Sequence, residues 1–137
     1  MKHLLYPYGP SGAGKTRLLQ MMETTLAEQC ETEVVIRTGA ERLVAEMVSD
    51  LPSNGSQFFA KYSEVENLVV DNYWVLARRP HAARMLARLI RDRQNAGKLT
   101  VVASDLPLAK IDNEDAEIAQ LFADAMFINL GRSVPHS

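Results

Sequence analysis

The sequence predicts an α/β domain of three layers, with helices on both faces of a five-stranded parallel sheet. Five short apolar segments recur along the 137 residues, and segments with helical spacing of apolar residues separate them. Strands separated by helices pair in parallel, and the connecting helices cover the sheet. A chain of this length forms one domain, which we expect over residues 1–130, with a flexible tail over 131–137.

The first half of the chain starts with a strand and a helix. Residues 3–8 form an apolar run before a glycine-rich turn, which predicts a buried strand. Pro7 lies inside this run and cannot donate to a ladder, so we expect a bulge or a strand end there. Residues 15–29 have leucine and methionine at helical spacing, residues 33–38 are β-branched and apolar, and residues 40–51 have one apolar helical face.

The second half continues the alternation. A loop at 52–55 precedes a short helix at 57–63. The continuous apolar residues of the third strand, 67–71, suit a parallel strand covered on both faces. The longest helix, 80–96, has a proline in its first turn and Gly97 after its end. The remaining elements are expected at 99–103 (strand), 112–123 (helix) and 126–130 (strand).

A phosphate-binding loop lies between the first strand and the first helix. Its backbone can wrap closely and point amide hydrogens inward, and the dipole of the following helix also favours phosphate. Lys15 would reach the β- and γ-phosphates, and the Thr16 hydroxyl would hold Mg²⁺. The pattern predicts a P-loop NTPase fold that binds ATP or ADP. The loop and its flank consist of Gly9, Pro10, Ser11, Gly12, Ala13, Gly14, Lys15, Thr16 and Arg17.

The third strand ends in Asp71, which we expect to hold Mg²⁺ through water. The alternative is an aspartate that only caps the next turn. Asn72 follows where many ATPases of this architecture have a second acid. An amide can position a water but cannot accept its proton, so slow or absent hydrolysis is predicted. For Tyr73 and Trp74, core packing is favoured over a place near the nucleotide or on a partner surface.

The longest helix carries a stripe of arginines. Arg84, Arg88 and Arg91 fall at i, i+4 and i+7, opposite an apolar face. The stripe predicts contact with single-stranded DNA or an acidic partner, but a solvated face whose arginine stems cover apolar surface is favoured. No aromatic residue interleaves with these arginines, so base stacking is not predicted. Three further arginines lie nearby in the sequence: Arg78, Arg79 and Arg93.

From about Leu4 to about Ile111 the chain resembles the AAA+ ATPase core of the DnaA, Hda and DnaC-type helicase-loader proteins. The resemblance rests on residues 8–20 (YGPSGAGKTRLLQ), 33–39, the phenylalanine–tyrosine helix before the third strand, 68–77 (LVVDNYWVLA) and 100–111 (TVVASDLPLAKI). In that family the last segment carries sensor 1, which reads the γ-phosphate. The resemblance implies this role for Ser104 and Asp105, which match that position.

The departures from the family pattern concern hydrolysis and assembly. Asn72 replaces the second acid, and residues 118–122 contain no arginine where the family has its arginine finger. The sequence stops at Ser137, directly after the fifth strand, so we expect a core truncated before the lid and sensor 2. We also expect no module that reads duplex DNA by sequence.

Composition excludes a membrane span, because no apolar run reaches the roughly 18 residues that one needs. The single cysteine, Cys30, fits a reducing compartment, and we expect a cytoplasmic protein. The function hypothesis is a nucleotide-dependent adaptor or weak ATPase in DNA replication or mobile-element DNA handling, with a replication- or helicase-related protein partner. The alternatives are an active ATPase of the helicase-loader type, which is stimulated by a partner and slow without it, and a pseudo-ATPase interaction protein with an empty site.

Overall fold

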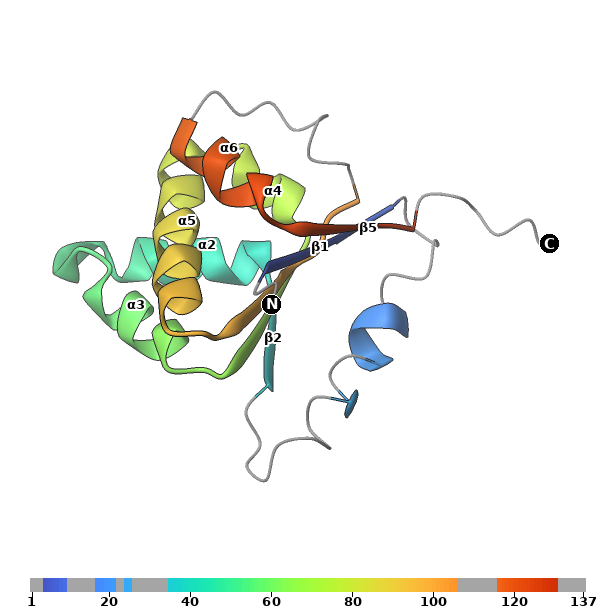
Figure 1. Ribbon diagram of the computed structural model, residues 1–137. Coiled ribbons are helices and arrows are strands. Elements are labelled where there is room, and N and C mark those ends of the chain that lie inside the picture. Colours follow the sequence, from blue (N-terminus) through green and yellow to red (C-terminus); the bar gives the residue numbers. More distant parts are fainter. Residues whose placement is uncertain (1–3, 10–16, 22–23, 26–34, 106–115, 131–137) are drawn as a thin grey trace.

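A parallel sheet with the strand order β2-β3-β4-β1-β5 forms the centre of the molecule (Figure 1). The computed structural model describes residues 4–9, 17–21, 24–25, 35–105 and 116–130. The strands are β1 (Leu4–Tyr8), β2 (Val35–Gly39), β3 (Asn67–Asp71), β4 (Leu99–Val102) and β5 (Met126–Asn129). Each overlaps its predicted range, so the predicted α/β class and five-stranded parallel sheet are confirmed.

Helices cover both faces of the sheet. Helices α2 to α6 pack on one face, and the helical segment 17–21 places Leu19 against the other (Figure 1). The first group consists of α2 (Ala40–Ser49), α3 (Ser56–Ser63), α4 (Tyr73–Ala77), α5 (Pro80–Asn95) and α6 (Ala116–Ala123). Within the described ranges, no helix combines the length and the apolar character that crossing a bilayer requires.

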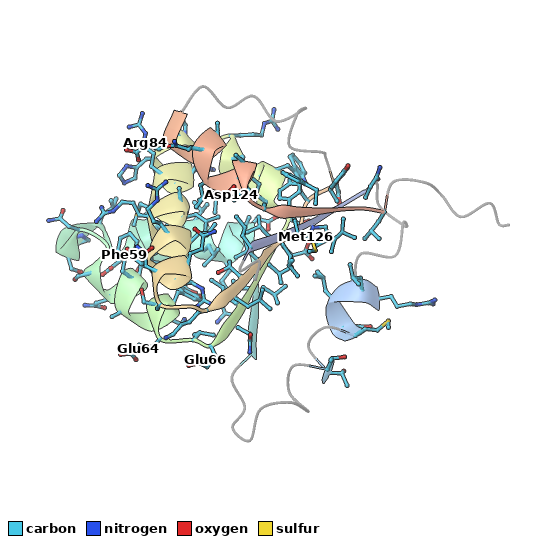
Figure 2. All side chains as sticks on the ribbon, viewed as in Figure 1. Phe59, Glu64, Glu66, Arg84, Asp124 and Met126 are labelled. Atoms are coloured by element: carbon cyan, nitrogen blue, oxygen red, sulfur yellow. The ribbon has the colours of Figure 1, made fainter. Side chains whose placement is uncertain are left out.

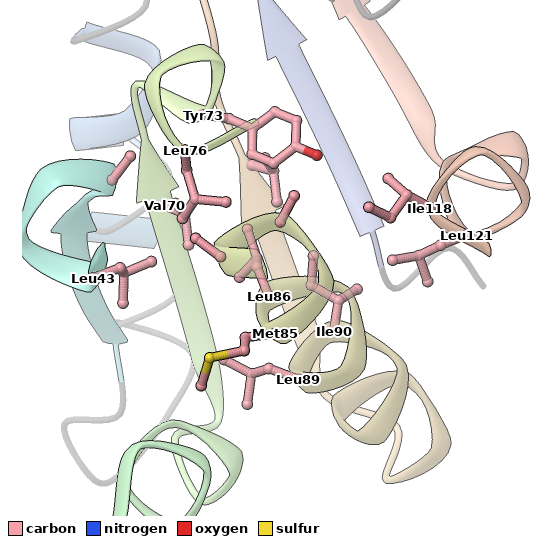
Figure 3. Packing of buried hydrophobic residues seen from close by; sticks show 14 of the residues in the cluster. Leu43, Val70, Tyr73, Leu76, Met85, Leu86, Leu89, Ile90, Ile118 and Leu121 are labelled. Carbon is pink, nitrogen blue, oxygen red and sulfur yellow. The ribbon is translucent and has the colours of Figure 1, made fainter. Parts of the chain in front are cut away.

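Successive side chains of β3 contribute to two separate apolar clusters. Leu68 and Val70 belong to the larger cluster under α2 to α6, whereas Val69 belongs to the smaller one with Leu19. This alternation follows from the period of two along a strand, and it makes β3 apolar on both faces. Helix α5 contributes the apolar face that its sequence predicted (Figure 3), namely Met85, Leu86, Leu89 and Ile90.

The expected bulge or strand end at Pro7 is wrong. Strand β1 continues to Tyr8, and its ladder with β5 runs through Pro7 without a break. The Pro7 carbonyl accepts a hydrogen bond from the backbone N–H of Ser104, at 3.1 Å, so the missing donor of Pro7 also faces β4. The β1–β4 ladder accordingly stops at Leu5 and resumes at Tyr8 in the same register. Pro7 therefore interrupts pairing on one side only.

Two short elements were not anticipated. Helix α2 ends at Ser49, before the predicted end at residue 51. A 3₁₀ turn (Leu51–Ser53) follows and extends into the predicted loop at 52–55. Asp50 joins the two helices: its carboxylate accepts hydrogen bonds from the Ser53 hydroxyl and, at 2.9 Å, from the N–H of Phe58 in α3. The Ser53 hydroxyl, followed by the Phe58 amide, lowers the pKa of Asp50. The other unanticipated element is α4, whose five residues are too few to show a helical period.

Helix α5 begins and ends as its sequence predicted. Pro80 occupies its first turn, and Gly97 follows its end with φ of 75°. The N–H of Gly97 donates to the Gln94 carbonyl at 2.9 Å, and the N–H of Lys98 donates to the Arg93 carbonyl at 2.8 Å. This pair of bonds is the Schellman motif, which requires the left-handed conformation that glycine adopts easily.

Arg93 lies fully buried near the amino ends of β3 and β4, apart from the arginine stripe with which the sequence associated it. Its Nε donates to the Thr100 hydroxyl at 2.8 Å. The other four N–H groups donate to the backbone carbonyls of Tyr62, Val65, Glu66 and Leu99. All five donors of the guanidinium therefore have partners within the protein. Burial lowers the pKa of Arg93 to about 10, which leaves the side chain charged at neutral pH.

Candidate nucleotide-binding site

The carboxyl ends of β1, β3 and β4 lie side by side in the middle of the sheet (Figure 1). Gly9 follows β1, Asp71 ends β3, and Ser104 follows β4. In open α/β sheets, ligands bind at the carboxyl ends of the strands, where the strand order changes direction. The structure therefore brings three predicted site residues to the edge where such folds bind ligands. Arg17 is exposed at the start of the helical segment 17–21.

The rest of the predicted phosphate loop lies outside the described residues. This applies to Pro10, Ser11, Gly12, Ala13, Gly14, Lys15 and Thr16. Residues 112–115 of the predicted acidic helix, Cys30 and the expected tail at 131–137 also lie outside them. The described part of the site is thus the platform from which the loop leaves β1, together with the neighbouring strand ends.

Ser104 is fully buried and bonded to β1 through its backbone and its side chain. Its N–H donates to the Pro7 carbonyl, and its carbonyl accepts from the N–H of Gly9 at 3.2 Å. Its hydroxyl forms a hydrogen bond with the side chain of Tyr6. Asp105, the other residue at the predicted sensor position, is half-buried and so more exposed than Ser104. The end of β4 is therefore fixed to the strand that leads into the loop.

Tyr6 is a site neighbour that the sequence did not reveal. Its ring is fully buried and packs edge-on against Tyr73 and Phe122, with ring centroids 6.2 and 5.7 Å away. Burial raises the pKa of Tyr6 to about 12, and the hydrogen bond with Ser104 acts in the opposite direction. The phenol therefore stays neutral at physiological pH. In the sequence, its only signal was a hydroxyl-bearing aromatic residue inside an apolar run.

The turn between β3 and α4 has a specific geometry. Asn72 adopts the left-handed conformation, with φ of 60° and ψ of 41°, which asparagine tolerates better than most residues. Its N–H donates to the Asp71 carboxylate at 2.8 Å, and the N–H of Tyr73 donates to the Ala103 carbonyl at 2.9 Å. Tyr73 is buried, as core packing predicted, whereas Trp74 is half-buried. The turn thus fixes Asp71 and Asn72, both half-buried, beside the end of β4.

The residues present suit Mg²⁺ in part. A carboxylate oxygen such as that of Asp71 is a ligand that this ion prefers, and Mg²⁺ at nucleotide sites takes further ligands from phosphates and water. Within the described ranges, no group of three or more His, Cys, Asp or Glu side chains could hold a metal ion. A magnesium ion at Asp71 would therefore depend on ligands from the nucleotide, from water or from the phosphate loop.

The arginine stripe of α5 is exposed on the outer side of the helical layer. Arg84, Arg88 and Arg91 are all exposed, and Figure 2 shows Arg84 and Phe59 on the side away from the sheet. The guanidinium of Arg88 lies 5.0 Å from the centroid of the Phe59 ring, which belongs to α3. An aromatic side chain therefore does lie among these arginines, although the sequence gave no sign of it, because it comes from another helix.

Comparison with known proteins places the chain in one family. A sequence model of the family described as Bacterial DnaA ATPase domain matches residues 3–129. The chromosomal replication initiator protein DnaA of Buchnera aphidicola is 27% identical over 127 residues, which cover 92% of this chain and 28% of that protein. The chain thus spans about a quarter of the length of the curated relatives that it matches.

Solved structures share the fold. Domain III of the Thermotoga maritima replication initiation protein DnaA superposes with a TM-score of 0.84 at 23% identity, covering 93% of this chain and 54% of that one. A replication initiator DnaA bound to AMPPCP and single-stranded DNA gives 0.81 at 23% identity, covering 93% and 40%. The DnaC helicase loader gives 0.72 at 15% identity, covering 92% and 77%.

Proposed function

This chain belongs to the bacterial DnaA ATPase domain family, and we propose that it binds ATP or ADP with Mg²⁺ at the carboxyl ends of β1, β3 and β4. The observation that carries the proposal is the placement of Gly9, Asp71 and Ser104 at one edge of the sheet. A DnaA of the same fold is bound to AMPPCP, an ATP analogue, which supports a nucleotide as the ligand.

Each part of the site has a proposed role. The backbone N–H groups of residues 11–17, together with Lys15, hold the phosphates, while Thr16 and Asp71 hold Mg²⁺, which neutralises phosphate charge when bound. Ser104 is fully buried and its hydroxyl is bonded to Tyr6, so we assign the γ-phosphate side to the more exposed Asp105, which as an anion would act through water or Mg²⁺. In this arrangement Ser104 supports the sensor strand from within the sheet.

Asn72 argues against fast hydrolysis. Its half-buried amide follows Asp71, where it can orient a water but cannot accept the proton of an attacking one. We therefore propose a nucleotide-dependent adaptor or weak ATPase, acting with a protein partner in DNA replication or mobile-element DNA handling. Hydrolysis at a useful rate requires groups that a partner supplies.

Calorimetry with purified protein tests the binding. Wild-type protein should bind ATP in the presence of Mg²⁺, and Lys15→Ala should abolish this because it removes the cation that meets the β- and γ-phosphates. Lys61→Ala, at an exposed lysine of α3 shortly before β3 begins and so at the opposite edge of the sheet, is the matched control and should bind like wild type. Undetectable binding by folded wild-type protein rejects the proposal.

Turnover is a separate test. Wild-type protein alone should hydrolyse ATP far below the typical enzyme rate of about 10 per second. Asn72→Asp should raise the rate, because the new carboxylate can accept a proton and aspartate also tolerates the left-handed conformation. Fast turnover by the wild type would show that the amide at position 72 does not limit hydrolysis.

The arginine stripe supports contact with single-stranded DNA, since it combines three exposed cations with the Phe59 ring. Charge reversal by Arg88→Glu and Arg91→Glu should weaken binding of a labelled oligonucleotide at low salt and flatten its salt dependence. Arg42→Glu on α2 serves as the control for net charge. Equal binding by all variants would return the stripe to the role of a solvated helix face.

A further inference from the structure

Tyr6 occupies an unusual place for a polar side chain. It lies three residues before Gly9 in a central strand and has no exposed surface. A buried tyrosine hydroxyl normally needs a hydrogen-bond partner, because an unsatisfied one costs free energy. The partner here is the hydroxyl of Ser104, at the end of the neighbouring strand. The side chain of Tyr6 therefore connects β1 to β4.

This connection spans the interruption that Pro7 causes. The β1–β4 ladder lacks the pairs that would involve Tyr6 and Pro7, and it resumes only where Tyr8 meets Ser104. Within the gap, the backbone N–H of Ser104 donates to the Pro7 carbonyl. The hydrogen bond between the Tyr6 and Ser104 side chains adds a second tie at the place where the ladder has lost a donor.

The ring of Tyr6 extends the same support to β3. It packs edge-on against Tyr73, at 6.2 Å and 87°, directly after Asn72. The N–H of Tyr73 in turn donates to the carbonyl of Ala103, the residue before Ser104. One buried side chain thus bonds to Ser104, directly before Asp105, and packs against Tyr73, two residues after Asp71.

We propose that Tyr6 is a positioning residue for nucleotide discrimination, acting through the hydrogen bond that holds Ser104. The inference rests on the proposed function. Fixing Ser104 fixes the position of Asp105, which follows it in the chain. Because ADP lacks the γ-phosphate that Asp105 would reach through water or Mg²⁺, loosening this tie should weaken ATP binding and leave ADP binding nearly unchanged.

The test compares ATP and ADP affinities of Tyr6→Phe by calorimetry. Phenylalanine keeps the ring packing and removes only the hydroxyl. Loss of one such hydrogen bond predicts a weakening of ATP binding of roughly three- to ten-fold, with ADP affinity within about two-fold of wild type. Tyr62→Phe is the matched control: Tyr62 is equally buried, but its hydroxyl bonds to Glu46 in α2, at 2.8 Å. It should change neither affinity.

A second variant removes the other half of the same bond. Ser104→Ala should reproduce the selective loss of ATP affinity, and the double variant should lose little more, because both changes break one interaction. A merely structural role would lower thermal stability and leave the ratio of ATP to ADP affinity unchanged, and that result overturns the inference. Equal weakening of both nucleotides also overturns it. Absence of any nucleotide binding by wild-type protein rejects the proposed function and this inference together.

Discussion

Buried polar groups have different surroundings at the amino and carboxyl ends of the strands. Near the amino ends of β3 and β4, all five donors of Arg93 meet acceptors of the protein itself. At the carboxyl ends, buried Ser104 and Tyr6 support residues that are only half-buried, among them Asp71 and Asp105. A buried charge whose donors are all used within the chain stabilises the fold, whereas half-buried carboxylates on a rigid platform can meet a ligand. The position of a charge therefore says more about function than its presence.

The largest expected effect is a loss of stability when Arg93, near the amino ends of β3 and β4, is replaced. Arg93→Met removes the donor from the buried Tyr62 carbonyl and Thr100 hydroxyl and from three part-buried carbonyls, and each buried group left unpaired costs about 1–3 kcal/mol. The free energy of unfolding should fall by at least about 3 kcal/mol in urea titrations. Arg91→Met, at an exposed position on the same helix, should stay within about 0.5 kcal/mol of wild type. Equal effects would contradict the structural role of Arg93.

A smaller effect is expected at the carboxyl ends of the strands, where the titration of Tyr6 makes stability depend on pH. Because the pKa of Tyr6 is raised to about 12 in the folded protein, its contribution to stability is complete below pH 10 and is lost as pH rises towards 12. Wild type should therefore lose up to about 2 kcal/mol relative to Tyr6→Phe across this range. Arg93 titrates in both proteins for reasons that do not involve Tyr6, so its contribution cancels in this difference. Parallel stability curves for the two proteins would show that Tyr6 titrates normally.

The smallest expected effect concerns the outer face of α5. Arg88→Ala removes the cation from the Phe59 ring, and exposed contacts of this kind contribute about 0.5–1 kcal/mol. Chemical denaturation should detect a loss of that size, while Arg91→Ala provides the control without a ring contact. A larger loss would mean that Arg88 packs as part of the core, and would weaken its assignment to nucleic-acid contact.

The sequence predicted the strands and the long helix because their signals are local. The continuous apolar run of β3 and the proline and glycine at the two ends of α5 act over a few residues. The role of Arg93 could not be predicted in this way, since its partners come from residues 62–66 and 99–100 and depend on the packed fold. In the sequence, Arg93 was only one of three further arginines near the stripe.

At the candidate site, the sequence identified the residues at the strand ends but not the contacts between β1 and β4 that hold these ends in place. Gly9 and Asp71 could be placed because the carboxyl ends of parallel strands share one edge, whereas Ser104 was identified through the resemblance to the family's sensor 1. The continuation of β1 through Pro7 was missed, because the sequence does not tell which neighbour a missing donor faces. The contact of Tyr6 with Ser104 was missed for a related reason: it joins residues 98 positions apart. The roles assigned to the phosphate-loop residues stay predictions.

The most direct test of the account is the change in melting temperature on adding ATP with Mg²⁺. Saturating nucleotide stabilises a protein that binds it only when folded, by about 2.7 kcal/mol at a hundred times the dissociation constant. We expect a clear rise in melting temperature for wild type, a rise of similar size for Arg93→Lys at the opposite end of the sheet, and none for Lys15→Ala. A rise that persists in Lys15→Ala, or that is absent from wild type, would contradict nucleotide binding at the carboxyl ends of β1, β3 and β4.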